Sequence, residues 1–520
     1  LRDRQAEALA LTNLARLYEM QVKPSETLTQ KEIRNLATAK KLTEQALSLS
    51  NEINADNRQI LYTQRHQLGR IFRATGNIKA ALSSYAEAWN ILQSLRQDLV
   101  TSADNQFTFR QNIEPIYREF IDLLLQYRDK NNLVLQTDRD KINIVLQTDR
   151  NEINIEKREL QEESEAQKNP LYIARLVMQS LQLAELDNFF QEPCSQPVGK
   201  PLEIDKIDKD AVVIYPIILE NRLEIITSQA GKPISKSVLV NKDCVNKALE
   251  KLANIIYNNT TLEQNSALNI NLSKDASGQL NESEQKKLEN NQRDLQQLSG
   301  QIYDWLIKPL EDEKLIRPLA ENNHLGKKAQ TLVFVLDRSF QKIPIAALYD
   351  CTSKKYLIEK YNVVLNLGQK LVSKEPFPRL NVKILAAGTS KPQAIEEDEL
   401  QGLEIVEKEL DNIEELEKLG VATTILREQQ FNKNNLRTKI KASPTILHLT
   451  THGVFSSNRE RTFILASDGK INVDEFQELL NPRGSVRNKK IELLVLSACQ
   501  TASGDERAAL GMAGVAIRSE

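Results

Sequence analysis

A short apolar run near the end of the chain, residues 491–499, places the strongest constraint on the fold. Charged and polar residues 487–490 precede the run, and turn-forming residues 500–505 follow it. A continuous apolar run between such signals is typical of a strand buried on both faces of a parallel sheet. Because reaction sites in open α/β sheets lie beyond the carboxyl ends of such strands, Cys499 occupies the position expected of a nucleophile.

A second run, residues 444–451, is rich in β-branched residues and leads directly to His452 and Gly453. The chain between His452 and Cys499 is long enough for one crossover between neighbouring parallel strands. Glycine after the histidine lets the backbone turn sharply and approach a ligand closely. A cysteine and a histidine at adjacent strand ends would form a dyad in which His452 takes the thiol proton. The alternative for Cys499 is a small buried hydrophobic side chain.

The residues around both candidates resemble the two active-site blocks of the CHAT domain. The matching stretches are residues 449–455, 496–504 and 510–514, with further matches upstream at 331–339, 343–348 and 356–361. CHAT domains are caspase- and separase-like cysteine peptidases, often fused behind tetratricopeptide repeats in cyanobacteria and other bacteria. In caspases the histidine also lies about 50 residues upstream of the cysteine. The caspase Gln-Ala-Cys signature is absent, and Ser497, Ala498 and Cys499 stand in its place.

The resemblance implies a caspase-like α/β domain over residues 205–520, with a mainly parallel sheet flanked by helices. It assigns Cys499 as nucleophile and His452 as base, with no cofactor and no metal. The backbone N–H groups of Gly453 and Cys499 would be the oxyanion donors.

Three acidic residues are candidates for substrate binding. Asp337 ends a predicted strand at the same sheet edge as His452 and Cys499. In the resemblance, the loop that contains Asp337 borders the substrate groove. A turn-forming role explains Asp337 equally well. Asp505 and Glu506 follow the cysteine loop, where they could orient His452 or attract a basic substrate side chain. The favoured alternative is that they are helix N-terminal acids, which are common for dipole reasons alone.

Alternation of strand and helix patterns supports the α/β interpretation. A hairpin is predicted at residues 211–219 and 222–227, with a third strand at 237–240. Further strands are predicted at residues 332–336, 361–367, 382–387 and 423–426, and helices at 400–419, 433–440, 473–480 and 508–517.

Residues 1–128 have the pattern of antiparallel helix pairs. Small and large residues alternate there as in a tetratricopeptide repeat, at Leu68, Gly69, Phe72, Gly76, Ala81, Tyr85 and Ala88. A generic helical bundle is the alternative. Residues 129–168 contain a charged, duplicated segment, which indicates a solvated helical insert or a linker. Residues 169–192 are predicted to form a connecting helix.

Composition excludes several functions. The net charge of −2 gives no global attraction for nucleic acid, and no apolar run is long enough to span a membrane. The four cysteines form no CxxC pair, which is typical of a protein in a reducing compartment such as the cytoplasm.

His448 and His452 lie too far apart on a strand to share one metal ion. His448 is expected either to support His452 or to be a satisfied core histidine.

Taken together, these features predict a caspase-like cysteine endopeptidase that is regulated or targeted through its helical repeats. The predicted partners are a protein or peptide substrate and a regulatory protein, with no nucleic acid. The alternative is a catalytically inactive CHAT scaffold that binds peptides or proteins. We also expect the chain to be truncated at both ends. It starts at Leu1, without methionine and inside a helical pattern, and in the CHAT pattern further strands follow the cysteine strand. Little peptidase activity is expected from these residues alone.

Overall fold

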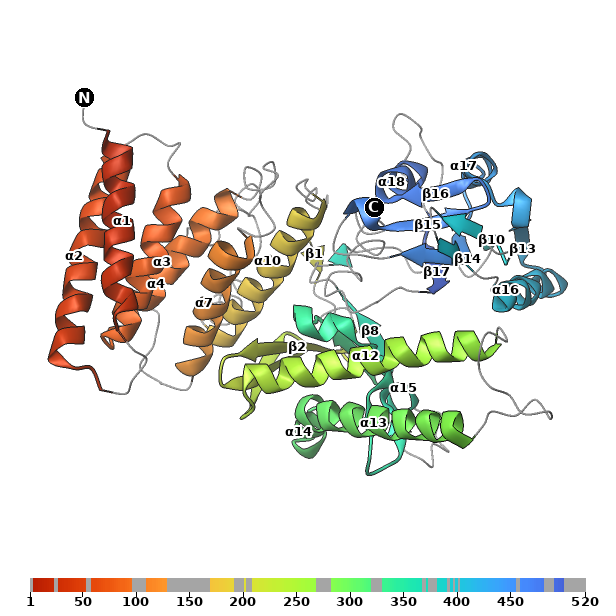
Figure 1. Cartoon of the computed structure of the whole chain (residues 1–520), viewed down its shortest axis with the longest axis horizontal. Coiled ribbons are helices and arrows are strands. Elements are labelled where there is room, and N and C mark those ends of the chain that lie inside the picture. Colours follow the sequence, from red (N-terminus) through yellow and green to blue (C-terminus); the bar gives the residue numbers. More distant parts are fainter. Residues whose placement is uncertain are drawn as a thin grey trace, which may run out of the picture. The chain divides into compact units, whose positions relative to one another are not determined.

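The computed structural model divides the chain into two compact units, residues 1–194 and 195–520 (Figure 1). The residues that the structure describes are 3–22, 27–52, 58–95, 109–128, 169–190, 201–202, 208–267, 282–318, 330–366, 371–372, 381–390, 393–395, 398–400, 403–454, 459–480 and 491–499. The predicted insert at 129–168 and the predicted helix at 508–517 lie outside them.

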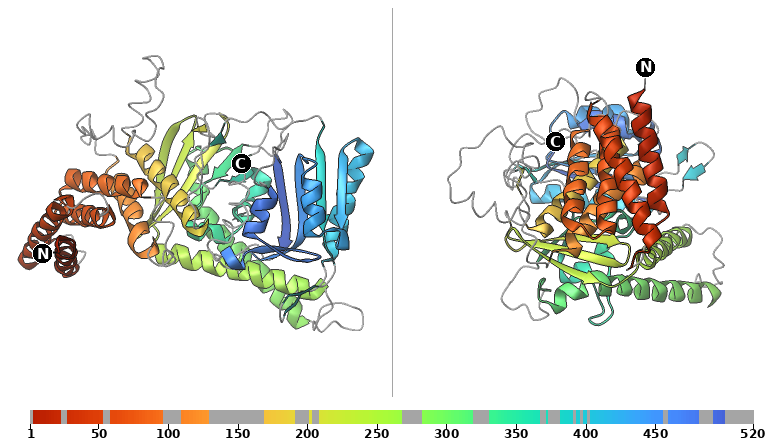
Figure 2. Two further views of the ribbon diagram at one scale, coloured as in Figure 1. Left: turned by 90° about the horizontal axis from the view of Figure 1, so that it is seen from above. Right: turned by 90° about the vertical axis from the view of Figure 1, so that its left-hand side faces the viewer.

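The first unit is entirely helical in its described part. Its elements are α1 (Arg4–Met20), α2 (Gln30–Glu52), α3 (Arg58–Ala74), α4 (Ile78–Ser94), the π-helical turn η2 (Phe109–Ile113), α7 (Glu114–Gln126) and α10 (Pro170–Phe190). Figures 1 and 2 show α1 to α4 running alongside one another. The expectation of a helical N-terminal region is therefore confirmed.

Small residues let α3 and α4 approach closely. A Cβ added at Gly69 would lie 3.0 Å from two ring carbons of the fully buried Tyr85. Ala81 and Ala88, on the same helix as Tyr85, are also completely buried. A large aromatic ring of α4 therefore packs into the space that the small residue of α3 leaves.

A five-stranded sheet forms the first part of the second unit. Its strands are β2 (Val212–Leu219), β3 (Arg222–Gln229), β4 (Lys232–Val238), β5 (Thr331–Phe334) and β8 (Asn362–Leu365), in the order β4-β3-β2-β5-β8. β2, β3 and β4 are antiparallel, which confirms the predicted hairpin, whereas β5 pairs in parallel with β2 and β8. The predicted strand at 361–367 is at the edge of this sheet.

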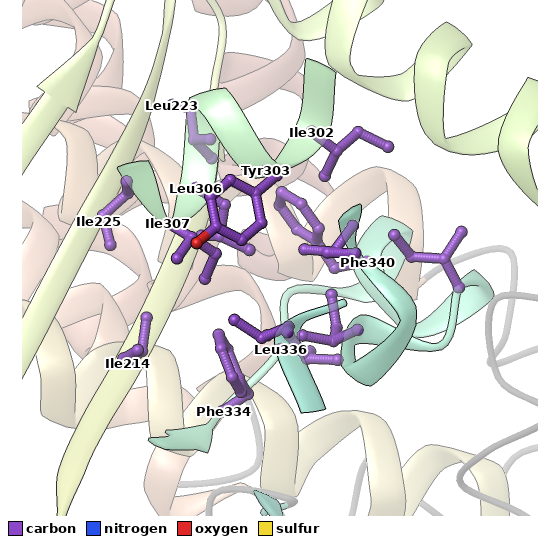
Figure 3. Close-up of a cluster of buried hydrophobic side chains, with 14 of the residues drawn as sticks. Ile214, Leu223, Ile225, Ile302, Tyr303, Leu306, Ile307, Phe334, Leu336 and Phe340 are labelled. Carbon is purple, nitrogen blue, oxygen red and sulfur yellow. The ribbon is translucent and has the colours of Figure 1, made fainter. Parts of the chain in front are cut away.

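Helices α12 (Lys242–Ala267) and α13 (Glu282–Leu306) pack beside this sheet and bury its main core. Figure 3 shows Ile214 of β2 and Phe334 of β5 together with Tyr303 and Leu306 of α13 in that core. All four side chains are at most 1% exposed, because apolar residues at strand and helix spacing meet there.

Smaller elements complete the second unit. They are β1 (Pro201–Leu202), α14 (Lys308–Asp312), η4 (Arg338–Lys342), η5 (Ile345–Ala347), β6 (Tyr349–Asp350), β7 (Lys355–Tyr356), α15 (Leu357–Lys360), β9 (Leu371–Val372), β11 (Gln393–Ile395), β12 (Asp398–Leu400), η6 (Glu415–Leu419), η7 (Glu428–Gln430) and η8 (Arg459–Arg461).

A second sheet, of six strands, carries both residues of the predicted dyad. It consists of β10 (Lys383–Gly388), β13 (Ala422–Arg427), β14 (Ile446–Val454), β15 (Phe463–Ala466), β16 (Gly469–Asn472) and β17 (Leu493–Cys499). β13, β10, β14 and β17 are parallel neighbours in that order, whereas β15 and β16 are antiparallel. The α/β class is confirmed, with mixed sheets. The expectation that β5 and β14 share a sheet edge is wrong, because they belong to different sheets.

In the described part of the chain, the helices that accompany the second sheet are α16 (Glu404–Glu414), α17 (Lys433–Ile440) and α18 (Val473–Leu480). The last two have the predicted bounds. Asn472 caps the start of α18 with two reciprocal hydrogen bonds. Its side chain accepts from the Glu475 N–H at 2.9 Å, and the Glu475 carboxylate accepts from the Asn472 N–H at 3.1 Å. The strand at 463–466 was not predicted.

Gly388 is required where β10 meets β14. A Cβ at this position would lie 2.6 Å from the Thr450 carbonyl oxygen, 2.7 Å from Thr450 Cγ2 and 2.8 Å from Val406 Cγ1. Because the nearest atom is backbone, Gly388→Ala is expected to cost roughly 3 kcal/mol, at the upper end for overpacking. Thermal denaturation of the full chain should show a melting transition lowered by several degrees. An unchanged transition would contradict this packing.

Candidate active site

The predicted nucleophile and base are opposite each other in one parallel ladder. β14 and β17 pair without interruption from Ile446 with Leu493 to His452 with Cys499. Neighbouring strands in a sheet lie about 4.8 Å apart. The backbones of residues 452 and 499 are therefore adjacent, at the carboxyl end of the parallel ladder, where α/β sheets place their reaction sites.

His452 is held in a strand that continues past it. The histidine is 9% exposed, and β14 runs on to Val454, with Gly453 paired to Ile464 of β15. The expected sharp turn at Gly453 is therefore wrong, because β14 changes its partner there without ending. On the same strand, the Thr451 hydroxyl donates to the Leu465 carbonyl at 2.6 Å, which fastens β14 to β15.

The cysteine strand is less enclosed than the histidine strand. Leu493 is 45% exposed and residues 494–497 are partly exposed, whereas Leu447 and Leu449 of β14 are buried. Within the described residues, β17 pairs only with β14. The expectation of a strand buried on both faces is therefore wrong for β17 and describes β14 better.

One carboxylate near the dyad was not singled out from the sequence. Glu409 of α16 accepts a hydrogen bond on Oε2 from Thr450 Oγ1 at 2.8 Å and from Ser497 Oγ at 3.0 Å. Its Oε1 lies 2.9 Å from His448 Nε2. His448 is therefore a satisfied histidine, as one of the two alternatives predicted. The signal for Glu409 was available, because it occupies a position on the apolar face of a predicted helix.

Asp337 lies in the five-stranded part of the second unit. It is 2% exposed, and its carboxylate accepts from the N–H of Ile218 at 2.9 Å and from the N–H of Arg338 at 2.8 Å. It begins the η4 turn, which is the turn-forming role given as its alternative. Asp337 follows a strand of a different sheet from His452 and Cys499, and its role in substrate binding remains a prediction. Asp505 and Glu506 lie outside the described residues.

The carboxylate of Glu428 binds the loop that follows β10. Glu428 follows β13 and has a left-handed backbone with φ of 49°. Its carboxylate accepts from the Ser390 N–H at 2.8 Å and the Ser390 hydroxyl at 2.5 Å. The carboxyl ends of β10 and β13 are thereby tied together, in the same sheet as residues 452 and 499.

A cysteine and a histidine opposite each other at the end of a parallel ladder are the arrangement that the resemblance to CHAT domains predicts. In agreement with it, residues 296–519 match the CHAT domain family. The match begins inside α13 and includes β5 and the entire second sheet, whereas β2, β3 and β4 precede it. No curated protein sequence matches the chain. None of the helices in the described part of the chain is long and apolar enough to cross a membrane.

Proposed function

We propose that the protein is a cysteine endopeptidase of the caspase-like CHAT type, with Cys499 and His452 as its dyad. The observation that carries this proposal is the direct pairing of residues 452 and 499 in the β14–β17 ladder. The similarity of residues 296–519 to CHAT domains supports the same reaction class.

In this proposal the thiol of Cys499 transfers its proton to His452, and the thiolate attacks the scissile carbonyl carbon. Backbone N–H groups of Gly453 and Cys499 stabilise the oxyanion. As the C–N bond breaks, His452 returns the proton to the leaving amine. His452 then removes a proton from water, whose oxygen attacks the thioester carbon. The C–S bond breaks, the carboxylic acid product leaves, and His452 returns the proton to the sulfur of Cys499.

The helical unit is assigned the role of binding a regulatory protein or the substrate. Its tetratricopeptide-like packing at Gly69 and Tyr85 supports this assignment. Cys244 and Cys351 are unpaired and exposed, which supports a reducing compartment such as the cytoplasm.

The alternative is a catalytically inactive CHAT scaffold that binds peptides or proteins. A cysteine without an activating histidine would keep an ordinary thiol pKa and react slowly. The reactivity of Cys499 therefore distinguishes the two functions without any knowledge of the substrate.

Alkylation by iodoacetamide at pH 6 is the test. If His452 lowers the pKa of the Cys499 thiol, Cys499 should react about tenfold faster than Cys244 and Cys351, which lie at exposed positions, since more thiolate outweighs its lower nucleophilicity. The rates are read by mass spectrometry of each cysteine peptide in one sample. His452→Ala should remove the advantage. Equal, slow alkylation of all three cysteines in the wild type would favour the scaffold.

A further inference from the structure

Glu409 lies where a helix packed on a sheet would normally place an apolar residue. On α16, Val406 and Leu410 are buried against β10, and Ile413 packs beside them. Position 409 falls on the same face, three residues after Val406 and four before Ile413. A carboxylate there costs desolvation that an apolar side chain would not. Packing alone therefore does not account for Glu409.

The carboxylate is bonded to two different strands. Oε2 receives hydrogen bonds from Thr450 of β14 and from Ser497 of β17, and these two residues are opposite each other in the ladder. A single oxygen atom thus bridges the strands that carry the dyad. His448, two residues earlier on β14, bonds the other oxygen and fixes the direction of the carboxylate.

The bridge is placed directly before the reacting positions. Thr450 is two residues before His452, and Ser497 is two residues before Cys499, so each is about 6.6 Å along its strand from the dyad. β17 has no other strand partner within the described part of the chain. Among the described residues, one ladder and this bridge therefore hold β17 in alignment with β14.

We infer that Glu409 is a positioning residue, whose carboxylate locks β17 against β14 so that Cys499 and His452 stay aligned. This inference rests on the proposed peptidase function. The alignment matters because small displacements of catalytic groups reduce rates by as much as about 100-fold. Glu409 acts through the strands and does not take part in proton transfer.

Three substitutions in the full chain separate positioning from general stability. Glu409→Ala removes the bridge. Glu409→Gln keeps the bridge, because the amide oxygen accepts hydrogen bonds from hydroxyl groups and the amide N–H groups donate hydrogen bonds to them. Thr451→Val is the matched control, since it removes a hydrogen bond from the same strand, donated to Leu465 of β15.

Two readouts are compared for each variant. The first is the iodoacetamide rate of Cys499 divided by that of the exposed Cys351 in the same sample. The second is hydrogen exchange of a peptide covering residues 493–499, relative to one covering 383–388. Glu409→Ala should slow Cys499 alkylation at least about tenfold and speed exchange in 493–499 about tenfold. Glu409→Gln and Thr451→Val should change both values less than threefold.

Equal changes in Glu409→Ala and Thr451→Val would show a general loss of stability and overturn the inference. Equal losses in the Ala and Gln variants would also overturn it, because the bridge would then not be the cause. If wild-type Cys499 reacts no faster than Cys351, the proposed peptidase fails, and the exchange of residues 493–499 still decides the role of Glu409. Unchanged exchange in Glu409→Ala rejects that role.

Discussion

Any peptide cleavage by this protein is expected to disappear when Cys499 is replaced with alanine. The sulfur is the nucleophile that attacks the peptide bond in the proposed reaction, and alanine leaves nothing to form the thioester. His452→Ala should cause a comparable loss, since the thiol then lacks its base. Members of such a unit each cost about 10⁴- to 10⁶-fold in kcat when removed. A fluorogenic or proteome-derived peptide assay measures the effect.

Non-additivity makes this result specific to the dyad. The Cys499→Ala/His452→Ala double variant should be no slower than either single variant, because both residues serve one step. Cys351→Ala is the control, since that exposed cysteine lies outside the second sheet and should leave cleavage unchanged. Residual cleavage by Cys499→Ala at more than a few per cent of the wild-type rate would refute the assignment of the nucleophile.

The largest stability effect is expected at Lys360, in the core beside the five-stranded sheet. Its ammonium group donates to the Tyr303 hydroxyl at 2.6 Å and to Asp350 Oδ2 at 2.7 Å, and lies 2.9 Å from Glu311 Oε1. Lys360→Met would leave both carboxylates without their cation. Breaking a buried ion pair from one side costs about 3–5 kcal/mol. Urea denaturation followed by tryptophan fluorescence measures this loss.

Lys418→Met is the matched control for Lys360→Met. Lys418 pairs with Glu415 at 3.0 Å, but both side chains are more than half exposed. Exposed pairs of this kind contribute at most about 1 kcal/mol. A similar loss of unfolding free energy in both variants would show that the buried cluster around Lys360 stabilises the fold no more than an exposed ion pair does.

The effect of Lys360→Met should also depend on pH. Burial disfavours the Asp350 carboxylate, but hydrogen bonds from Lys360 and Ser353 outweigh burial, so the pKa of Asp350 lies below its usual value. A lowered pKa stabilises the folded state fully above the pKa of the unfolded chain, about 3.9, and the contribution is lost as the pH falls toward the folded value. The difference between wild type and variant should therefore be constant near pH 7 and shrink below about pH 4.

Local patterns predicted the separate elements well. Residues 433–440 and 473–480 form helices with the predicted bounds, because their apolar spacing and Asn caps act over a few residues. The assignment of strands to sheets could not be predicted this way. β2 and β5 pair although more than a hundred residues separate them, and a strand pattern does not specify its partner.

His452 and Cys499 were predicted from the ends of strand patterns, whereas the hydrogen bonds of Glu409 to their strands were not predicted. His452 and Cys499 each follow a recognisable β pattern, and parallel strands place their carboxyl ends together. Glu409 comes from a helix, and its function depends on which strands that helix covers. Only the packed structure shows that Glu409 reaches Thr450 and Ser497 at once.

β14 and β17 differ in the number of strands with which they pair, and this difference should decide which of them opens first on heating. β14 pairs with β10, β17 and β15, whereas β17, within the described residues, pairs with β14 alone. Segments with fewer partners open at a lower free-energy cost than the rest of a fold. On warming, β17 should therefore separate before β14 loosens. His452 would still be in place when the cysteine strand leaves it, so the proposed peptidase would lose activity before the sheet melts.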